Sequence, residues 1–300
     1  MAVELAEDVG PDHLRVAYER FGPPDAPPVL LVMGVAAQMI GWPDPLCEAL
    51  AARGLHVIRF DNRDVGLSSH ITGAPAPDIF AAARGDLSSA SYTLSHMAAD
   101  TAGLLDALGL DSAHVVGASM GGAIAQVLAI EHPDRVRSLT SLMATTGAPD
   151  VGQPSPATIA AFFGPPPITR DDVVARGLAV MRTCAGTGPY TLDESAAADR
   201  FARQYDRAHD PDGAGRQGVA TLATGDRTAR LQALTVPTLV IHGTVDQMVH
   251  PSGGRATATA IPGAELVLVD GLGHDLAAAF WPDLVDRVTA LVARVEGERA

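Results

Sequence analysis

The sequence contains no lysine and only two cysteines, and each shortage excludes a kind of chemistry. All 21 basic residues are arginine, so Schiff-base formation and a lysine general base are excluded. Cys47 and Cys184 are too few and too far apart for a disulfide framework or a zinc knuckle, and we expect two reduced, buried thiols. No cysteine, histidine and carboxylate cluster has the spacing of a metal site, so neither a metal nor a cofactor is expected.

Long apolar runs are also missing. The longest run, from Val29 to Ala37, is interrupted by Gly34 and is far shorter than the roughly 20 residues that a membrane helix needs. The residues from Met1 to Asp8 show neither a basic n-region nor an apolar h-region. We therefore expect a cytoplasmic protein without a membrane partner.

Positive charge is scarce. The chain carries 21 basic against 35 acidic residues, a formal net charge of −14. Nucleic acid and anionic membranes would be repelled, so a neutral small molecule is the favoured partner. A length of 300 residues with 47% hydrophobic and 19% charged residues indicates a globular chain with a large core. No motif indicates an oligomeric state.

Apolar runs alternate with helical patterns in the first half of the chain. Such alternation predicts a parallel sheet with helices on its faces. The expected strands are Val29–Met33, Val57–Phe60, Val115–Val116 and Val136–Met143. The expected helices are Pro45–Arg53, Leu94–Leu108 and one that follows Ser119 and ends before Pro133.

The pattern changes at about residue 147. Prolines and glycines punctuate short helical stretches there, and strand signals return only at Val236–Ile241 and Glu265–Val269. We therefore expect a mostly helical cap, residues 147–232, inserted between the sixth and seventh core strands. Residues 1–146 and 233–300 would form the two parts of an α/β core with a mostly parallel, doubly wound sheet.

The segment Ala113–Gly122 has the pattern of a nucleophile elbow. A short apolar run leads into Gly117-Ala118-Ser119-Met120-Gly121 and then into a helical pattern. A serine at such a sharp strand-to-helix turn needs a strained backbone, and the flanking glycines leave room for it. The sequence therefore predicts an exposed nucleophile at Ser119.

A serine nucleophile needs a base and a group that orients the base. Asp246 and His274 follow the last two expected strands, so they would lie at the same sheet edge as Ser119. Their order, serine, aspartate, histidine, is that of an α/β hydrolase. Asp270 and Asp275 are rival carboxylates, and His250 is a weaker alternative base.

Two backbone N–H groups are expected to bind the oxyanion. The helix that begins after Ser119 leaves the N–H of Met120 unpaired. Gly34 permits a tight turn after the Val29–Met33 strand, so that Val35 would present its N–H to the same oxygen.

With these residues located, the chain resembles the α/β-hydrolase superfamily along nearly its whole length. More narrowly, it resembles aclacinomycin methylesterase and related serine esterases, in which the residues matching Val35 and Met120 form the oxyanion hole. The segments that carry this likeness are Leu30–Gly34, Gly41–Asp44, Gly54–Asp64 and Ala113–Gly121. The resemblance implies hydrolysis of a carboxylic ester, such as a methyl ester of an aromatic polyketide.

The residues thus predict a serine hydrolase that cleaves a small, neutral ester through an acyl-enzyme, with Ser119, Asp246 and His274 as the catalytic triad. The alternatives are a cofactor-free perhydrolase, a C–C bond lyase or hydrolase with the same triad, and a non-catalytic ligand receptor.

Two further groups of residues are interpreted as structural. The charged segment Asp61–Ser68 would brace the loop after a core strand, its acids and arginines paired with one another or with backbone. Six large cap side chains could wall a substrate pocket, but at helical spacings we expect them to be core. They are Phe162, Phe163, Met181, Tyr190, Phe201 and Tyr205.

Overall fold

An eight-stranded sheet runs through the described part of the chain, which in this computed structural model comprises residues 2–162 and 167–299. The strand order is β1-β2-β4-β3-β5-β6-β7-β8. The strands are β1 (Glu4–Val9), β2 (Leu14–Phe21), β3 (Pro28–Val32), β4 (His56–Phe60), β5 (Ala113–Ala118), β6 (Val136–Leu142), β7 (Thr238–Gly243) and β8 (Glu265–Val269). The predicted strands are present with bounds shifted by up to two residues, whereas the hairpin of β1 and β2 is not predicted from the sequence.

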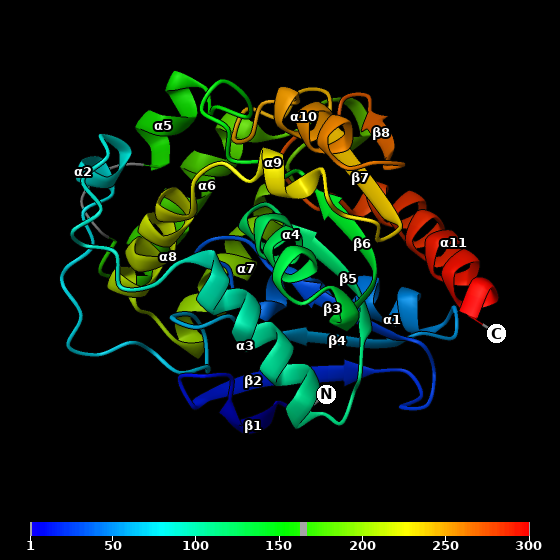
Figure 1. Cartoon of the computed structure of the whole chain (residues 1–300). Coiled ribbons are helices and arrows are strands. Elements are labelled where there is room, and N and C mark those ends of the chain that lie inside the picture. Colours follow the sequence, from blue (N-terminus) through cyan, green and yellow to red (C-terminus); the bar gives the residue numbers. More distant parts are fainter. Residues whose placement is uncertain (1, 163–166, 300) are drawn as a thin grey trace.

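Strand direction decides where the loops gather. The strands from β4 to β8 in this order pair in parallel, while β2 pairs antiparallel with both β1 and β4. The carboxyl ends of the parallel strands therefore meet at one edge of the sheet (Figure 1). The mostly parallel α/β sheet predicted from the sequence is confirmed.

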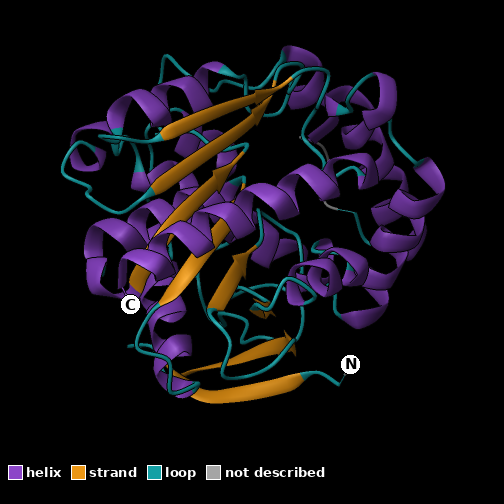
Figure 2. Ribbon diagram, turned by 90° about the vertical axis from the view of Figure 1, so that its right-hand side faces the viewer, coloured by secondary structure: helices purple, strands orange, loops and turns teal. Residues whose placement is uncertain are grey.

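Helices cover both faces of the sheet (Figure 2). On one face, α1 (Asp44–Ala51) packs against α11 (Trp281–Arg299), and both contact strands. On the other face, α3 (Leu94–Ala107) packs against α4 (Met120–Glu131), with α10 (Ser252–Ala260) beside β7. The capping box of Thr93 and His96 fixes the start of α3 by satisfying free backbone groups.

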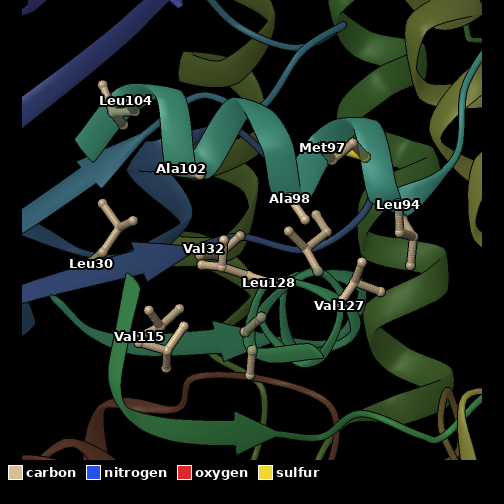
Figure 3. Packing of buried hydrophobic residues seen from close by; sticks show 14 of the residues in the cluster. Leu30, Val32, Leu94, Met97, Ala98, Ala102, Leu104, Val115, Val127 and Leu128 are labelled. Carbon is tan, nitrogen blue, oxygen red and sulfur yellow. The ribbon is translucent and has the colours of Figure 1, made fainter. Parts of the chain in front are cut away.

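Apolar side chains fill the space between these layers. Met97 and Ala98 on α3 lie opposite Val127 and Leu128 on α4, next to Val32 of β3 (Figure 3). Strands β3 and β5 are buried on both faces because helices cover both sides of the sheet. Their sequences are therefore nearly continuous apolar runs. This packing fixes β3, β5 and α4, the three elements that surround Ser119.

The cap segment, residues 147–232, lies in sequence between β6 and β7. Its described helices are α5 (Pro156–Phe162), α6 (Arg170–Cys184), α7 (Glu194–Arg207), α8 (Pro211–Thr224) and α9 (Thr228–Leu231), and the short α2 (Ile79–Ala83) from the core packs against α8. Figure 1 shows α5 to α8 beyond the carboxyl ends of the strands, whereas α9 lies between α4 and α10. Among the described residues, no helix has both the length and the apolar character to cross a membrane.

Candidate active site

Ser119 lies at the junction between β5 and α4, and its backbone is strained. Its φ of 57° and ψ of −123° put a non-glycine residue in a left-handed region, which costs of order 1–3 kcal/mol unless the surroundings enforce it. The strand ends at Ala118 and the helix begins at Met120, so the turn is one residue long. Ser119 is half-buried at the sheet edge.

The two glycines of the elbow allow close backbone contacts. An added Cβ at Gly117 would lie 2.2 Å from the carbonyl oxygen of Gly121, and one at Gly121 would lie 2.1 Å from that of Val32. Real Cβ atoms do not approach a carbonyl oxygen so closely, so α4 can begin this near to β3 and β5 only with glycine at both positions.

His274 bridges Ser119 and Asp246. Its Nε2 lies 3.0 Å from the Ser119 hydroxyl oxygen, and its Nδ1 lies 2.7 Å from Oδ2 of Asp246. Because an ionised carboxylate only accepts hydrogen bonds, Nδ1 carries the proton and donates it, which leaves Nε2 to accept from the serine hydroxyl. The structure thus brings together the three side chains that the sequence singled out.

Asp246 is fully buried and has a partner for each oxygen. Oδ1 accepts from the backbone N–H groups of Met248 and Val249, both at 2.9 Å. Burial opposes the charge, but the imidazoles of His274 and His242 outweigh burial and hold the pKa of this carboxyl well below its usual range. Asp246 is therefore a fixed negative charge behind the imidazole.

The rival residues have other partners. Asp270 accepts from the hydroxyl of Thr244 at 3.0 Å, and Asp275 lies 3.6 Å from Nη1 of Arg200. The ring of His250 lies 3.0 Å from the hydroxyl oxygen of Ser252. Among the described residues, neither rival carboxylate makes a hydrogen bond to His274.

The loop after β3 lies directly against Ser119. An added Cβ at Gly34 would lie 3.1 Å from the Cβ of Ser119. The N–H of Val35 belongs to the next peptide group after Gly34, and so it lies close to this contact. Met120 is the first residue of α4 and is buried. Within the described chain, neither N–H group is engaged by another residue. We call residues 34–38 the β3 loop.

The charged segment Asp61–Ser68 holds the residue that directly follows the β3 loop. Asp61 is fully buried and accepts from the N–H groups of Met39 at 2.7 Å and Leu67 at 2.9 Å. The pairing with backbone agrees with the sequence interpretation. Arg63, however, pairs with Asp100 rather than with an acid of its own segment, because it points towards α3.

Asp64, His70 and Asp210 form a cluster within metal-ligating reach. Arg216 already bridges its two carboxylates, since its guanidinium donates two hydrogen bonds to Asp64 at 2.9 Å and one to Asp210 at 3.0 Å. A cation would have to displace this guanidinium, so we interpret the cluster as an ion-pair network that ties α8 to the core.

Three contributions to the site have no signal in the sequence. His242, at the end of β7, lies 3.3 Å from Oδ2 of Asp246 and 2.7 Å from the carbonyl oxygen of Val249. The backbone N–H of His274 donates to the carbonyl oxygen of Cys184 in α6 at 2.7 Å. Gln217 of α8 binds the β3 loop. The contacts of His274 with Cys184 and of Gln217 with the β3 loop join residues far apart in sequence, where periodicity and motif spacing give no information.

Of the six large cap side chains that are expected in the core from the sequence, the five described ones are only partly buried. These are Phe162, Met181, Tyr190, Phe201 and Tyr205. Phe201 packs on Gly177 of α6, and Tyr190 packs against the apolar cluster that includes α11. Phe163 lies outside the described residues. The two cysteines are buried and unbridged as predicted, and burial raises the pKa of both thiols to about 12.

The sheet and the strained serine at its edge are those of an α/β hydrolase. A model of the alpha/beta hydrolase fold family matches residues 27–278. The chain therefore belongs to this family, and it is a hydrolase, so the class of protein predicted from the sequence is confirmed.

Individual relatives narrow the likeness. The chain is 29% identical over 299 residues to rhodomycin D methylesterase DnrP of Streptomyces peucetius, covering 93% of this chain and 95% of that protein. It is 32% identical over 195 residues to 2-hydroxymuconate semialdehyde hydrolase of Pseudomonas putida, covering 61% and 63%. Among solved structures, the enol-lactonase of Burkholderia xenovorans LB400 shares the fold, with a TM-score of 0.74, 24% identity and coverage of 97% and 100%. The expected resemblance to methylesterases is confirmed.

Proposed function

We propose that this chain is a serine esterase that hydrolyses a small, neutral carboxylic ester through an acyl-enzyme. The observation that carries the proposal is the relay from the Ser119 hydroxyl through the imidazole of His274 to the buried carboxylate of Asp246, with distances of 3.0 and 2.7 Å. Nucleophile, base and orienting group are thus within hydrogen-bond reach of one another at one edge of the sheet. The likeness to a methylesterase supports the same reaction.

In the first half of the reaction, the oxygen of Ser119 attacks the ester carbonyl carbon while Nε2 of His274 takes the hydroxyl proton. The carbonyl electron pair moves onto the oxygen, and the N–H groups of Val35 and Met120 bind the resulting oxyanion. When the intermediate collapses, the bond to the alcohol oxygen breaks and His274 returns the proton to that oxygen. The alcohol leaves, and the acyl group stays on Ser119.

In the second half, water repeats these steps. Its oxygen attacks the acyl carbon, and His274 accepts the water proton. The intermediate then expels the oxygen of Ser119, which recovers the proton from His274. Asp246 stays ionised throughout, since its two backbone hydrogen bonds and its imidazole contacts favour the charged form. It holds the ring orientation and stabilises the transient imidazolium.

The charge of the chain bears on the substrate. A net charge of −14 opposes the approach of anionic substrates and assists the departure of an anionic product. An ester has no charge at the reacting group, whereas hydrolysis releases a carboxylate. We therefore place the substrate among neutral esters, with methyl esters of polycyclic aromatics as the first class to test, because the relative DnrP is named a methylesterase of rhodomycin D.

The test combines a substrate panel with covalent labelling. We expect the wild type to hydrolyse p-nitrophenyl esters of graded chain length or methyl esters of polycyclic aromatics, and to be labelled once by a fluorophosphonate. Ser119→Ala should lose both properties, and the control Ser95→Ala, which changes a serine hydrogen-bonded to Glu131, should keep them. Labelling that persists in Ser119→Ala would contradict the proposal.

Hydrolysis of a carbon–carbon bond is the second candidate. The similarity to 2-hydroxymuconate semialdehyde hydrolase favours it, because that relative is 32% identical. Turnover of 2-hydroxymuconate semialdehyde can be measured by the loss of its absorbance. This assay distinguishes carbon–carbon hydrolysis from ester hydrolysis. We expect the ester to be the better substrate by kcat/KM, and a clear preference for the semialdehyde would reverse the assignment.

A further inference from the structure

The β3 loop is held by a buried glutamine of the cap segment. The backbone N–H of Ala36 donates to Oε1 of Gln217 on α8 at 2.8 Å, across 181 positions of sequence. The other end of the same amide is also used, since Nε2 donates to the carbonyl oxygen of Arg63 at 2.7 Å. Gln217 is completely buried. Both of its polar groups are therefore satisfied by backbone atoms on two core loops.

The conformation of Ala36 makes this contact important. Its φ is 60°, which places an alanine in the left-handed region that costs about 1–2 kcal/mol. Such a residue keeps its conformation only when neighbouring contacts enforce it. The hydrogen bond that Oε1 of Gln217 accepts from Ala36 fixes the plane of the peptide between Val35 and Ala36, and with it the orientation of Val35.

The rest of the β3 loop is also tied to the cap segment. Nε2 of Gln38 donates to the carbonyl oxygens of Gln204 and Ala208, at 2.7 and 2.9 Å, at the end of α7. Nη2 of Arg207 lies 3.1 Å from Oδ2 of the buried Asp61. Two cap helices thus hold the loop on the far side of Val35, whereas Gly34 holds it against Ser119.

We propose that Gln217 is a positioning residue for the oxyanion hole and that α8 is therefore a working part of the active site. This inference rests on the proposed function, in which the N–H of Val35 binds the oxyanion. Gln217 does not touch the reacting atoms. It acts through Ala36, by keeping the neighbouring N–H aimed at the position that the oxyanion will occupy.

The proposal predicts a particular kinetic signature. Losing the hydrogen bond leaves the Ala36 N–H and the Arg63 carbonyl unpaired, and the β3 loop relaxes towards ordinary backbone angles. Because a misplaced donor weakens binding of the transition state and not of the substrate, kcat should fall about 10- to 100-fold with KM changed less than about 3-fold.

Three variants of Gln217 and one control test the proposal. Gln217→Met keeps the volume but has no polar end, and Gln217→Asn is too short to reach both backbone partners. Both should lose kcat as stated. Gln217→Glu, whose complete burial favours the neutral acid, retains an acceptor for the Ala36 N–H and an O–H donor for the Arg63 carbonyl oxygen, and should recover most of it. The control Thr221→Val removes a hydrogen bond from Thr221 to the carbonyl oxygen of Gln217, one turn along α8, and should leave kcat unchanged.

A second measurement separates positioning from general damage. A trifluoromethyl ketone adds to the serine and places an oxyanion in the hole, so its affinity should fall in step with kcat in the Met and Asn variants. A merely structural role would lower the number of active sites found by burst titration and leave the ketone affinity of the remaining sites intact. If Gln217→Met does not fold, the contrast between the Asn and Glu variants decides.

The outcomes distinguish the two proposals. A wild type that neither hydrolyses esters nor reacts with a fluorophosphonate contradicts the proposed function. A wild type that does both, together with folded Met and Asn variants of unchanged kcat and ketone affinity, overturns the role of Gln217 alone.

Discussion

The core sheet and the cap segment are stabilised by different kinds of contact. In the core, apolar side chains on both faces of the sheet form two large buried clusters. In the cap segment, most side chains are only partly covered, and in α6 only Cys184 is fully buried. Ala220 and Leu231 join the core cluster, but several of the buried connections between cap segment and core are polar, through Gln217, Arg216 and Arg227.

This difference has consequences for stability and for activity. Apolar burial is non-directional and contributes in proportion to area, so the core supplies most of the stability. Hydrogen bonds contribute little net free energy but fix geometry. We infer that changes in the core will mainly alter the free energy of unfolding, whereas changes in the buried polar contacts of the cap segment will mainly alter catalytic geometry.

The largest effect on kcat is expected at Asp246, in the loop that follows strand β7 of the core. Asp246→Asn keeps an oxygen for the N–H groups of Met248 and Val249 but removes the charge and the proper acceptor for Nδ1 of His274. We expect kcat to fall by about 10⁴-fold, since the imidazole is left in the wrong tautomer. The measurement is kcat for the best ester of the panel, with circular dichroism to check the fold.

The control for this variant is the rival carboxylate. Asp270→Asn alters only an exposed contact with Thr244 and should leave kcat within a few-fold of wild type. If the two variants lose activity equally, Asp246 is not the orienting group.

Removal of apolar volume tests the comparison directly. Leu128 on α4 is completely buried in the core, so Leu128→Ala should cost about 2–5 kcal/mol of unfolding free energy. Met181 on α6 is only partly buried, and Met181→Ala should cost less than half as much. Urea unfolding of both variants measures the difference, and equal losses would show that the cap segment is as well packed as the core.

The contrast also explains what the sequence could predict. Apolar periodicity marks the core strands and helices in the sequence. Ser119, Asp246 and His274 each come soon after the end of such a strand, so local patterns are enough to locate these residues at the sheet edge. The hairpin of β1 and β2 was missed because its strands alternate at the sheet margin and show several exposed positions. The pairing of β2 with β4 depends on tertiary contacts rather than on a local run.

The contacts between cap and core could not be predicted for a physical reason. Gln217 and Arg207 are ordinary polar residues on helices, and nothing nearby in sequence marks them as buried. Gln217 becomes buried, and Arg207 partly buried, only because the fold brings α7 and α8 onto the β3 loop, across 181 residues in the case of Ala36. Polar contacts of this kind leave no periodic signal, in contrast to apolar ones.

His114 is a buried polar residue of the core. It should make the stability of the core depend on pH. It is buried on β5, with Nδ1 2.7 Å from Ser138 and Nε2 3.0 Å from Glu296 of α11. Burial lowers the pKa of its imidazole from 6.5 to about 4. The unfolded chain thus binds a proton at higher pH than the folded one does, so stability falls as the pH drops below about 6.5.

The full contribution corresponds to about 3 kcal/mol, of which about 2 kcal/mol should be lost by pH 5 and the rest as the pH falls through 4. Urea unfolding of the wild type and of His114→Gln between pH 7 and pH 5 measures it, and the variant should show a flatter dependence. His13→Gln, which changes an exposed histidine paired with Asp8, serves as the control. Parallel curves for wild type and His114→Gln would contradict the prediction.

The smallest effect is expected on the surface of the cap segment. Arg170 of α6 donates two hydrogen bonds to Asp206 of α7, at 2.9 and 3.0 Å, but about half of each side chain is exposed to solvent. Water and salt screen such a pair, so a double-mutant cycle of Arg170→Ala and Asp206→Ala should give a coupling of about 0–1 kcal/mol that shrinks in 1 M salt. Asp206 is adjacent to Arg207, the residue that reaches Asp61, so the cycle also tests what positions α7. If the buried polar contacts hold α7 in place, kcat should not change in Arg170→Ala or in Asp206→Ala. A loss of kcat in both variants would mean that the surface ion pair sets the geometry of the β3 loop.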